Sequence, residues 1–130
     1  MYDKFLIVGE EFKNVIQAGN VTGFQIGVRL SYYRGIVLSL VDSLDLTVDG
    51  ETFPPESATV TVGGKTFPLA GLKNEPVAKW EFGEVGILTI HKPGGLKPGT
   101  HTLNLREHLN ISYVPTGFSG EDTKVIPLVG

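Results

Sequence analysis

The sequence predicts an all-β fold, an antiparallel β-sandwich or jelly-roll-like barrel, on three observations. Apolar and polar residues alternate along several stretches, which is the pattern of half-buried strands. The chain holds 17 glycines and 8 prolines among its 130 residues, and these breakers separate the alternating stretches at short intervals. No window carries a sustained apolar stripe with helical spacing. We expect a single domain over residues 1–130, since a chain of this length usually forms one core.

The first part of the chain predicts a hairpin followed by a sharp bend. Strand pieces are expected over residues 5–16, with a turn at 18–20. Residues 24–40 keep one apolar parity throughout, and a single strand of that length would reach about 56 Å. Strands usually span about 17–20 Å, so we expect the chain to change direction within the stretch SYYRG at 31–35, with Gly35 as the hinge.

The rest of the chain predicts further short strands with tight turns. Asp49-Gly50 and Gly63-Gly64 are strong signals for two-residue hairpin turns. A long loop at 71–84 carries the only tryptophan, Trp80. The glycine-rich tail from about residue 115 is expected to be mobile or to lie on a partner. The strand-like stretches are 44–48, 60–69 (a hairpin), 85–90 and 103–114.

Composition narrows the function classes. The absence of cysteine excludes disulfides, thiolate metal sites and thiol catalysis. The net charge is -3 with Lys and Arg scattered along the chain, which speaks against nucleic-acid binding. No segment approaches the roughly 20 apolar residues that span a bilayer, and the apolar run at the N-terminus is too short for a signal peptide. We expect a soluble, cytoplasmic protein that binds neither nucleic acid nor membrane.

No complete catalytic or metal-binding set is visible in the sequence. A nucleophile elbow, a phosphate loop and a dinucleotide fingerprint are all missing. The chain has no His-x-His pair, and the seven-residue spacing of His101 and His108 puts them on opposite faces of one strand. We therefore expect no catalytic residue, no metal and no cofactor in this chain, with the histidines exposed or hydrogen-bonded at strand ends.

Glu107 breaks the apolar parity of its strand and leaves three interpretations open. Its neighbours on the same face are leucines, so a regular strand would bury the carboxylate, at a high desolvation cost. A bulge at Arg106-Glu107 would rotate it outward. Alternatively, it forms a buried charge pair with Arg34, which lies on the core parity of its own run. The third interpretation is a functional acid that faces a cleft.

Aromatic and arginine side chains near the predicted bend suggest a contact surface. Tyr32 and Tyr33 fall on opposite faces of a strand, so at most one belongs to the core. Tyr, Trp and Arg are enriched at protein–protein hot spots, and exposed aromatic rings can also stack on sugars. We predict that Tyr32, Tyr33, Arg34 and Trp80 line an interface with a partner or the rim of an active site, with Phe82 as a further exposed aromatic candidate.

Several stretches taken together resemble a known family. They are VRLSYYRGIVLSLVDSLDLTVDG, WEFGE, HKPGGLKPGTH and NISYVP, in this order over about residues 2–115. The pattern resembles the small β subunits of bacterial C-glycoside deglycosidases. That resemblance implies a compact sandwich that docks on a larger α subunit, a TIM barrel that holds a divalent metal, typically manganese. The implied enzyme is a carbon–carbon lyase that cleaves 3-oxo-C-glycosides with flavonoid-type or other aromatic aglycones.

By the same resemblance, the metal ligands and the base belong to the α subunit, and the β subunit alone is inactive. A base removes the proton next to the sugar ketone, and the aglycone leaves as a carbanion equivalent. Two alternatives remain from the sequence itself. One is a free-standing carbohydrate-binding β-sandwich module, and the other is a structural homo-oligomer without a ligand.

Overall fold

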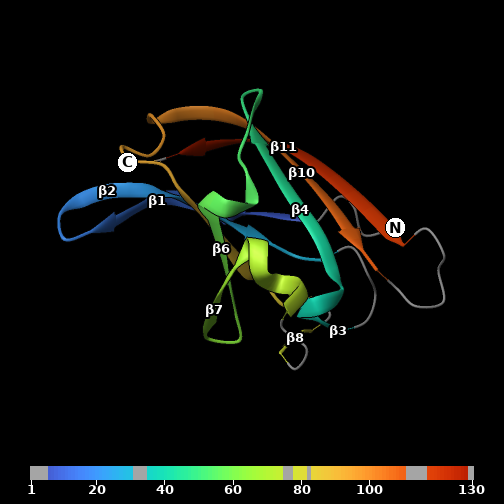
Figure 1. The fold of residues 1–130 in the computed structure, drawn as a ribbon. Coiled ribbons are helices and arrows are strands. Elements are labelled where there is room, and N and C mark those ends of the chain that lie inside the picture. The colour runs from blue at the N-terminus through green and yellow to red at the C-terminus, as the bar shows by residue number, and fades with distance from the viewer. Residues whose placement is uncertain (1–5, 31–34, 75–77, 82, 111–116, 129–130) are drawn as a thin grey trace.

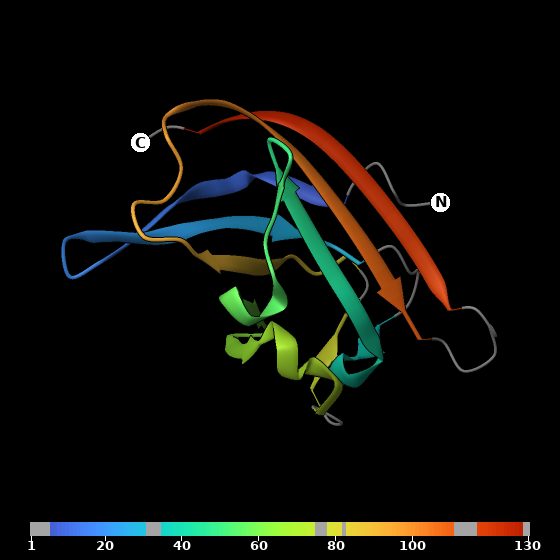
Figure 2. The same ribbon diagram turned by 45° about the horizontal axis from the view of Figure 1, so that its top comes forward.

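Two antiparallel sheets face each other across one apolar core in the computed structural model of the chain (Figures 1 and 2). The structure describes residues 6–30, 35–74, 78–81, 83–110 and 117–128. A small two-stranded sheet lies at one end of the sandwich, at the bottom of Figure 1. All strand pairs are antiparallel, so the all-β sandwich predicted from the sequence is confirmed.

The larger sheet has the strand order β1-β2-β9-β6-β7 and the smaller one the order β11-β10-β4-β5. The strands of the larger sheet are β1 (Ile7–Gln17), β2 (Asn20–Val28), β9 (Gly86–His91), β6 (Ala58–Val62) and β7 (Lys65–Pro68). Those of the smaller sheet are β11 (Phe118–Leu128), β10 (Gly99–Leu109), β4 (Val41–Val48) and β5 (Glu51–Thr52). The remaining elements are β3 (Ile36–Val37), β8 (Lys79–Trp80) and the short 3-10 segments η2 (Leu38–Leu40), η3 (Pro55–Ser57) and η4 (Leu69–Asn74).

Three two-residue turns join β1 to β2, β4 to β5 and β6 to β7, at the positions predicted from the sequence. In each turn both central residues have positive φ, for example 51° at Asp49 and 88° at Gly50. This geometry matches the right-handed twist of paired strands and favours Gly, Asn and Asp. The local sequence therefore fixes the register of all three hairpins.

The single-parity run from residue 24 to residue 40 does change sheets, as its length predicts. β2 ends at Val28 in the larger sheet, β3 begins at Ile36 in the two-stranded sheet, and β4 begins at Val41 in the smaller sheet. The chain thus leaves the larger sheet after Val28, enters the two-stranded sheet at Ile36 and reaches the second layer at Val41. Residues 31–34 of the predicted bend lie outside the described residues.

Alternating side chains from both layers fill the core. Phe24, Ile26 and Val28 on β2 have no exposed surface, and neither do Leu103 and Leu105 on β10. Each large apolar side chain buried in this way contributes about 1.5–3 kcal/mol relative to exposure. The interior is therefore held together mainly by apolar burial between the two sheets.

β11 is a strand that the sequence analysis missed. It pairs with β10 without a register shift, from Gly99 opposite Leu128 to Leu109 opposite Phe118. The expectation of a mobile tail from about residue 115 is therefore wrong for β11. Its inward positions are Gly120, Asp122 and Lys124 before the apolar Ile126 and Leu128, so alternation of hydrophobicity does not reveal the first part of the strand.

A buried carboxylate connects β11 to the other sheet. Asp122 is 8% exposed, and its Oδ2 accepts the backbone N–H of Ile7 at 3.0 Å and a proton of the Lys124 ammonium group at 2.6 Å. Ile7 begins β1, the edge strand of the larger sheet. Asp122 thus gives an otherwise orphaned edge N–H a hydrogen-bond partner and ties the two layers together along that edge. Within the ranges described, no helix has both the length and the apolar character needed to cross a membrane.

Candidate functional site

Three of the four residues predicted to contact a partner lie outside the described residues. Tyr32, Tyr33 and Arg34 fall between Leu30 and Gly35, in the segment that crosses from one layer to the other. Their role at an interface or at an active-site rim stays a prediction. The predicted charge pair of Arg34 with Glu107 is untested for the same reason.

Trp80 lies in the core, so the expectation that its ring is exposed is wrong. Its exposed fraction is 0%, and its indole Nε1 donates a hydrogen bond to the carbonyl oxygen of Glu84 at 2.8 Å. Gly86 provides the space, since a Cβ atom there would lie 2.6 Å from a ring carbon. The Glu84 carboxylate accepts the backbone N–H groups of Gly63 and Glu81, which folds the loop back onto the sandwich. Phe82 lies outside the described residues.

Glu107 keeps the inward orientation that strand parity predicts. It is 2% exposed and lies opposite Leu44 on β4 and Gly120 on β11. The register shift in the β10–β4 pairing comes after it, between His108 and Leu109. The interpretation that a bulge at Arg106-Glu107 turns it outward is therefore wrong. Gly120 lacks a side chain at the position across from the carboxylate, which leaves room for it inside the sheet. Asp122 is its diagonal neighbour on the same face, so two acidic residues share this part of the interior.

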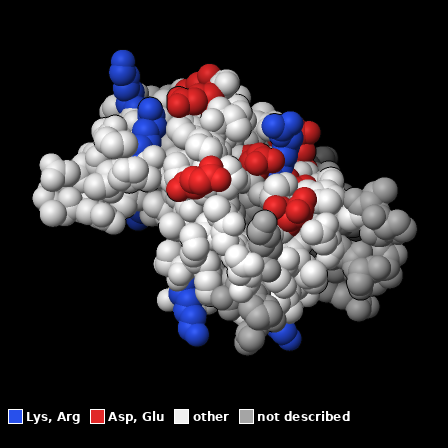
Figure 3. Space-filling model, viewed as in Figure 1, with Lys and Arg blue, Asp and Glu red and all other residues white. Residues whose placement is uncertain are grey.

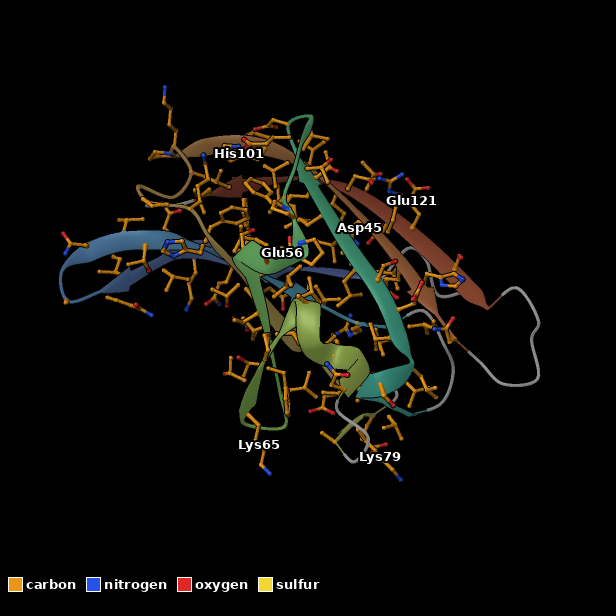
Figure 4. All side chains as sticks on the ribbon, viewed as in Figure 1. Asp45, Glu56, Lys65, Lys79, His101 and Glu121 are labelled. Atoms are coloured by element: carbon orange, nitrogen blue, oxygen red, sulfur yellow. The ribbon has the colours of Figure 1, made fainter. Side chains whose placement is uncertain are left out.

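The outer face of the smaller sheet carries polar side chains in cross-strand rows. The central row is charged, with Arg106 between two acidic residues. Figure 4 shows the two acids, Asp45 and Glu121, on β4 and β11. These residues and their neighbours line a shallow groove along the strands. The rows are Thr47–Asn104–Thr123, Asp45–Arg106–Glu121 and Ser43–His108–Ser119.

A small cavity adjoins this groove, with a volume of about 240 Å³. Its walls are partly apolar, from Leu44, Leu69 and Leu72, and partly acidic, from Asp42 and Glu56. Figure 3 shows acidic side chains gathered on the face of the molecule that carries β4, while several Lys and Arg side chains project from its margins. The complete lining is Ser39, Val41, Asp42, Ser43, Leu44, Pro55, Glu56, Leu69, Ala70, Leu72 and Asn110.

The cavity and the groove are neighbours and share one lining residue. Ser43 lines both, and Oδ2 of Asp42, in the cavity, lies 2.9 Å from Nδ1 of His108, in the groove. The side chains of this pair are partly exposed. The region therefore presents carboxylate, hydroxyl, imidazole and amide groups that can hydrogen-bond to a polar partner.

His101 and His108 lie on opposite faces of β10, as their spacing predicts. His108 belongs to the outer face, whereas the ring of His101 meets the edge of Phe12 in the interior at a centroid distance of 6.0 Å. Nδ1 of His101 lies 2.6 Å from Oδ2 of Asp49, and Nε2 lies 2.7 Å from the carbonyl oxygen of Lys97. In the part of the chain that the structure describes, no three His, Asp or Glu side chains converge as metal ligands.

Hydrogen bonds shift the pKa values of this pair in opposite directions. The backbone N–H of Thr102 and the His101 ring lower the pKa of Asp49 below its ordinary value. Burial acts to lower the pKa of His101, but the Lys97 carbonyl and the hydrogen bond and charge of Asp49 together outweigh it. The net result is a pKa of His101 above its ordinary value. Both shifts favour the charged forms.

The sequence is similar to proteins of one known family. A family model described as "C-glycoside deglycosidase beta subunit" matches residues 2–113. The C-glycoside deglycosidase beta subunit of Eubacterium cellulosolvens is 32% identical over 114 residues, which cover 87% of this chain and 78% of that protein. The 3'-dehydrocarminate deglycosidase beta subunit of a Microbacterium species is 28% identical over 95 residues, or 72% of this chain and 70% of that protein. Strand β11 lies beyond the range that the family model matches.

Proposed function

This chain belongs to the C-glycoside deglycosidase beta subunit family, and we propose that it is the accessory subunit of a heteromeric enzyme that cleaves C-glycosides. The match over residues 2–113 carries this proposal, because it spans the sandwich from β1 through β10. Coverage of most of both chains by the Eubacterium relative supports it further. The role of this chain in the enzyme would be to bind and stabilise a larger subunit.

The proposed partner is a metal-dependent α subunit with a TIM-barrel fold, which carries the metal ligands and the general base. Such an assignment rests on the family resemblance. A divalent metal, typically manganese, would supply Lewis-acid stabilisation of the negative charge that develops on the sugar. No chemical step is assigned to a residue of the present chain. Tyr32, Tyr33 and Arg34 are the proposed contact residues, since residues of these types dominate protein–protein hot spots.

The proposed substrate is a C-glycoside whose sugar has already been oxidised at C3. The name of the Microbacterium relative specifies a 3'-dehydro substrate, which supports this assignment. A ketone at C3 acidifies the proton at C2, and removal of that proton allows the C–C bond to an aromatic aglycone to break. A separate oxidising enzyme must therefore act before this one.

Co-expression of the chain with a candidate α subunit of the same family of enzymes tests the proposal. A stable complex should elute from size-exclusion chromatography at a mass above that of either protein alone, and the complex should cleave a 3-oxo-C-glycoside. The isolated chain should be inactive on the same compound. Two proteins that elute separately at micromolar concentrations would contradict the proposed assembly.

A carbohydrate-binding module predicts a different outcome from the same samples. The isolated chain would then bind glycosides without the larger subunit, and amide NMR signals of the groove on β4, β10 and β11 would shift on titration. Fluorescence of Trp80 is a poor probe of stacking here because the ring is fully buried. Absence of shifts across a panel of C- and O-glycosides, together with complex formation, supports the subunit role.

A further inference from the structure

His101 sits between two hydrogen-bond acceptors. Its Nδ1 lies 2.6 Å from a carboxylate oxygen of Asp49, and its Nε2 lies 2.7 Å from the backbone carbonyl oxygen of Lys97. A carbonyl oxygen cannot donate, and neither can an ionised carboxylate. A neutral imidazole carries only one N–H, so it can satisfy one of these acceptors but not both. Two acceptors at these distances favour the doubly protonated imidazolium, which can donate to both.

The carboxylate of Asp49 is held in its ionised, accepting form. Oδ1 accepts the backbone N–H of Thr102 at 2.8 Å, while Oδ2 faces His101. The backbone N–H of Asp49 in turn donates to the carbonyl of Thr102 at 2.9 Å. Asp49 occupies the first position of the β4–β5 turn with φ of 51°, a conformation that Asp and Asn adopt more readily than most residues. The turn thus presents a fixed carboxylate to the ring.

In the described part of the chain, the ring also contacts two uncharged groups. β1 contributes the neutral ring of Phe12, and the connection from β9 to β10 contributes the Lys97 carbonyl rather than its ammonium group. The charge that acts on the imidazole comes from Asp49. The side chain of His101 is 11% exposed, whereas that of Asp49 is 51% exposed, so the ring is largely covered while the carboxylate faces solvent. Protonation of one ring therefore links three separate segments of the fold.

Residues 92–98 connect β9 to β10, and His101 contacts this connection near its C-terminal end, at Lys97. Asn14 on β1 forms two hydrogen bonds with the backbone of Leu96. Nδ2 of Asn14 donates to the carbonyl oxygen of Leu96 at 3.0 Å, and Oδ1 of Asn14 accepts the N–H of Leu96 at 2.9 Å. Gly94 donates to the carbonyl of Val21 on β2 at 2.9 Å. These bonds are neutral and do not change with pH. The Lys97 carbonyl is held by His101.

We propose that His101 is a pH-dependent latch that, while protonated, fastens the Lys97 end of the 92–98 connection to the β4–β5 turn. On deprotonation the remaining N–H stays on Nδ1, because the hydrogen bond to a carboxylate is charge-assisted and the stronger of the two. Nε2 then faces the Lys97 carbonyl with a lone pair, and the two repel. The connection opens at Lys97 while its hydrogen bonds to Asn14 and the β4–β5 turn stay in place.

NMR of the full-length chain labelled with ¹⁵N-histidine tests the latch directly, with spectra recorded as the pH is raised. The chain has three histidines, and His91→Asn and His108→Asn variants assign the signals. We expect His101 to titrate at a midpoint above the ordinary histidine value, with both ring nitrogens protonated below that midpoint. Above that midpoint the proton should leave Nε2 and remain on Nδ1. A midpoint at or below the ordinary histidine value, or a proton that stays on Nε2, would overturn the proposal.

A carboxylate-to-amide pair of variants provides the second, matched measurement. Asp49→Asn keeps the size and the turn preference but removes the charge, whereas Asp42→Asn makes the same change beside His108. Hydrogen exchange is measured by mass spectrometry at one fixed pH near neutrality. It should accelerate over residues 97–101 in Asp49→Asn but not in Asp42→Asn. His101→Asn should accelerate the same segment, which keeps the test valid if Asp49→Asn fails to fold. Equal exchange in all variants and the wild type would overturn the latch.

Discussion

Asp49 and His101 join the β4–β5 turn to the start of β10 through a contact of 2.6 Å between Oδ2 and Nδ1. The two residues are 52 positions apart in the sequence, yet each favours the charged form of the other. The His101 ring also meets Phe12, whose ring contacts Phe24 at 6.5 Å in the core. A charged pair at the margin is thus continuous with the apolar interior.

Stability should depend on pH through this pair, with a sign fixed by the two pKa shifts. Because its pKa is raised, His101 contributes to the free energy of unfolding. This contribution is full at pH values below the ordinary histidine pKa and is lost as the pH rises through the raised pKa. Because its pKa is lowered, Asp49 also contributes to the free energy of unfolding. This contribution is full at pH values above the ordinary carboxylate pKa and is lost as the pH falls through the lowered pKa. Urea unfolding of wild type and His101→Asn from acidic to alkaline pH should show the difference in midpoint shrinking on the alkaline side. A difference that stays constant with pH, or one equal to that of His91→Asn, would contradict this assignment.

Trp80→Ala should destabilise the sandwich by about 3–5 kcal/mol, because it empties a fully buried aromatic site. The exposed Ile16, which is 62% accessible, provides the control, and Ile16→Ala should change stability by less than about 0.5 kcal/mol. Urea unfolding followed by circular dichroism measures both. Equal small effects would show that Trp80 lies at the surface after all.

Asp122→Ala should cost about 1–3 kcal/mol, because it leaves the buried N–H of Ile7 without its acceptor. Glu121→Ala removes the neighbouring carboxylate from the outer face of the same strand and should be near neutral. The comparison isolates the bond between the layers from the general loss of an acid on β11. Unfolding midpoints that fall by the same amount in both variants would contradict the structural role of Asp122.

Replacing Tyr32, Tyr33 and Arg34 together by alanine should weaken binding to the α subunit by at least about tenfold, since a hot-spot residue typically contributes more than 1 kcal/mol. The unfolding midpoint of the isolated chain reports any loss of fold. Val125→Ala, on the exposed face of β11, serves as a surface control. Unchanged affinity in a titration by calorimetry would remove these residues from the proposed interface.

Local signals in the sequence predicted the hairpins and the change of sheet, because both depend on nearby residues. The turns at Asp49-Gly50 and Gly63-Gly64 require positive φ, and their sequences state that requirement directly. The bend after Val28 follows from the length of one apolar parity. Strand parity also placed Glu107 inside correctly.

Long-range contacts account for what the sequence did not reveal. β11 carries Gly120, Asp122 and Lys124 on its inner side, so its place in the sheet depends on pairing with β10 and on the Asp122 bond to β1. The burial of Trp80 depends on space left by Gly86 and on a carbonyl four residues away. The acceptors around His101 come from two other segments, which no local pattern brings together.

Turnover of a 3-oxo-C-glycoside by the α subunit, measured while this chain is added in increasing amounts, tests the central claim most directly. We predict that the rate rises with added chain and saturates at a fixed molar ratio, whereas the chain alone gives no product. A rate that does not change over the whole titration, or full activity from this chain by itself, would contradict the proposed role as an accessory subunit.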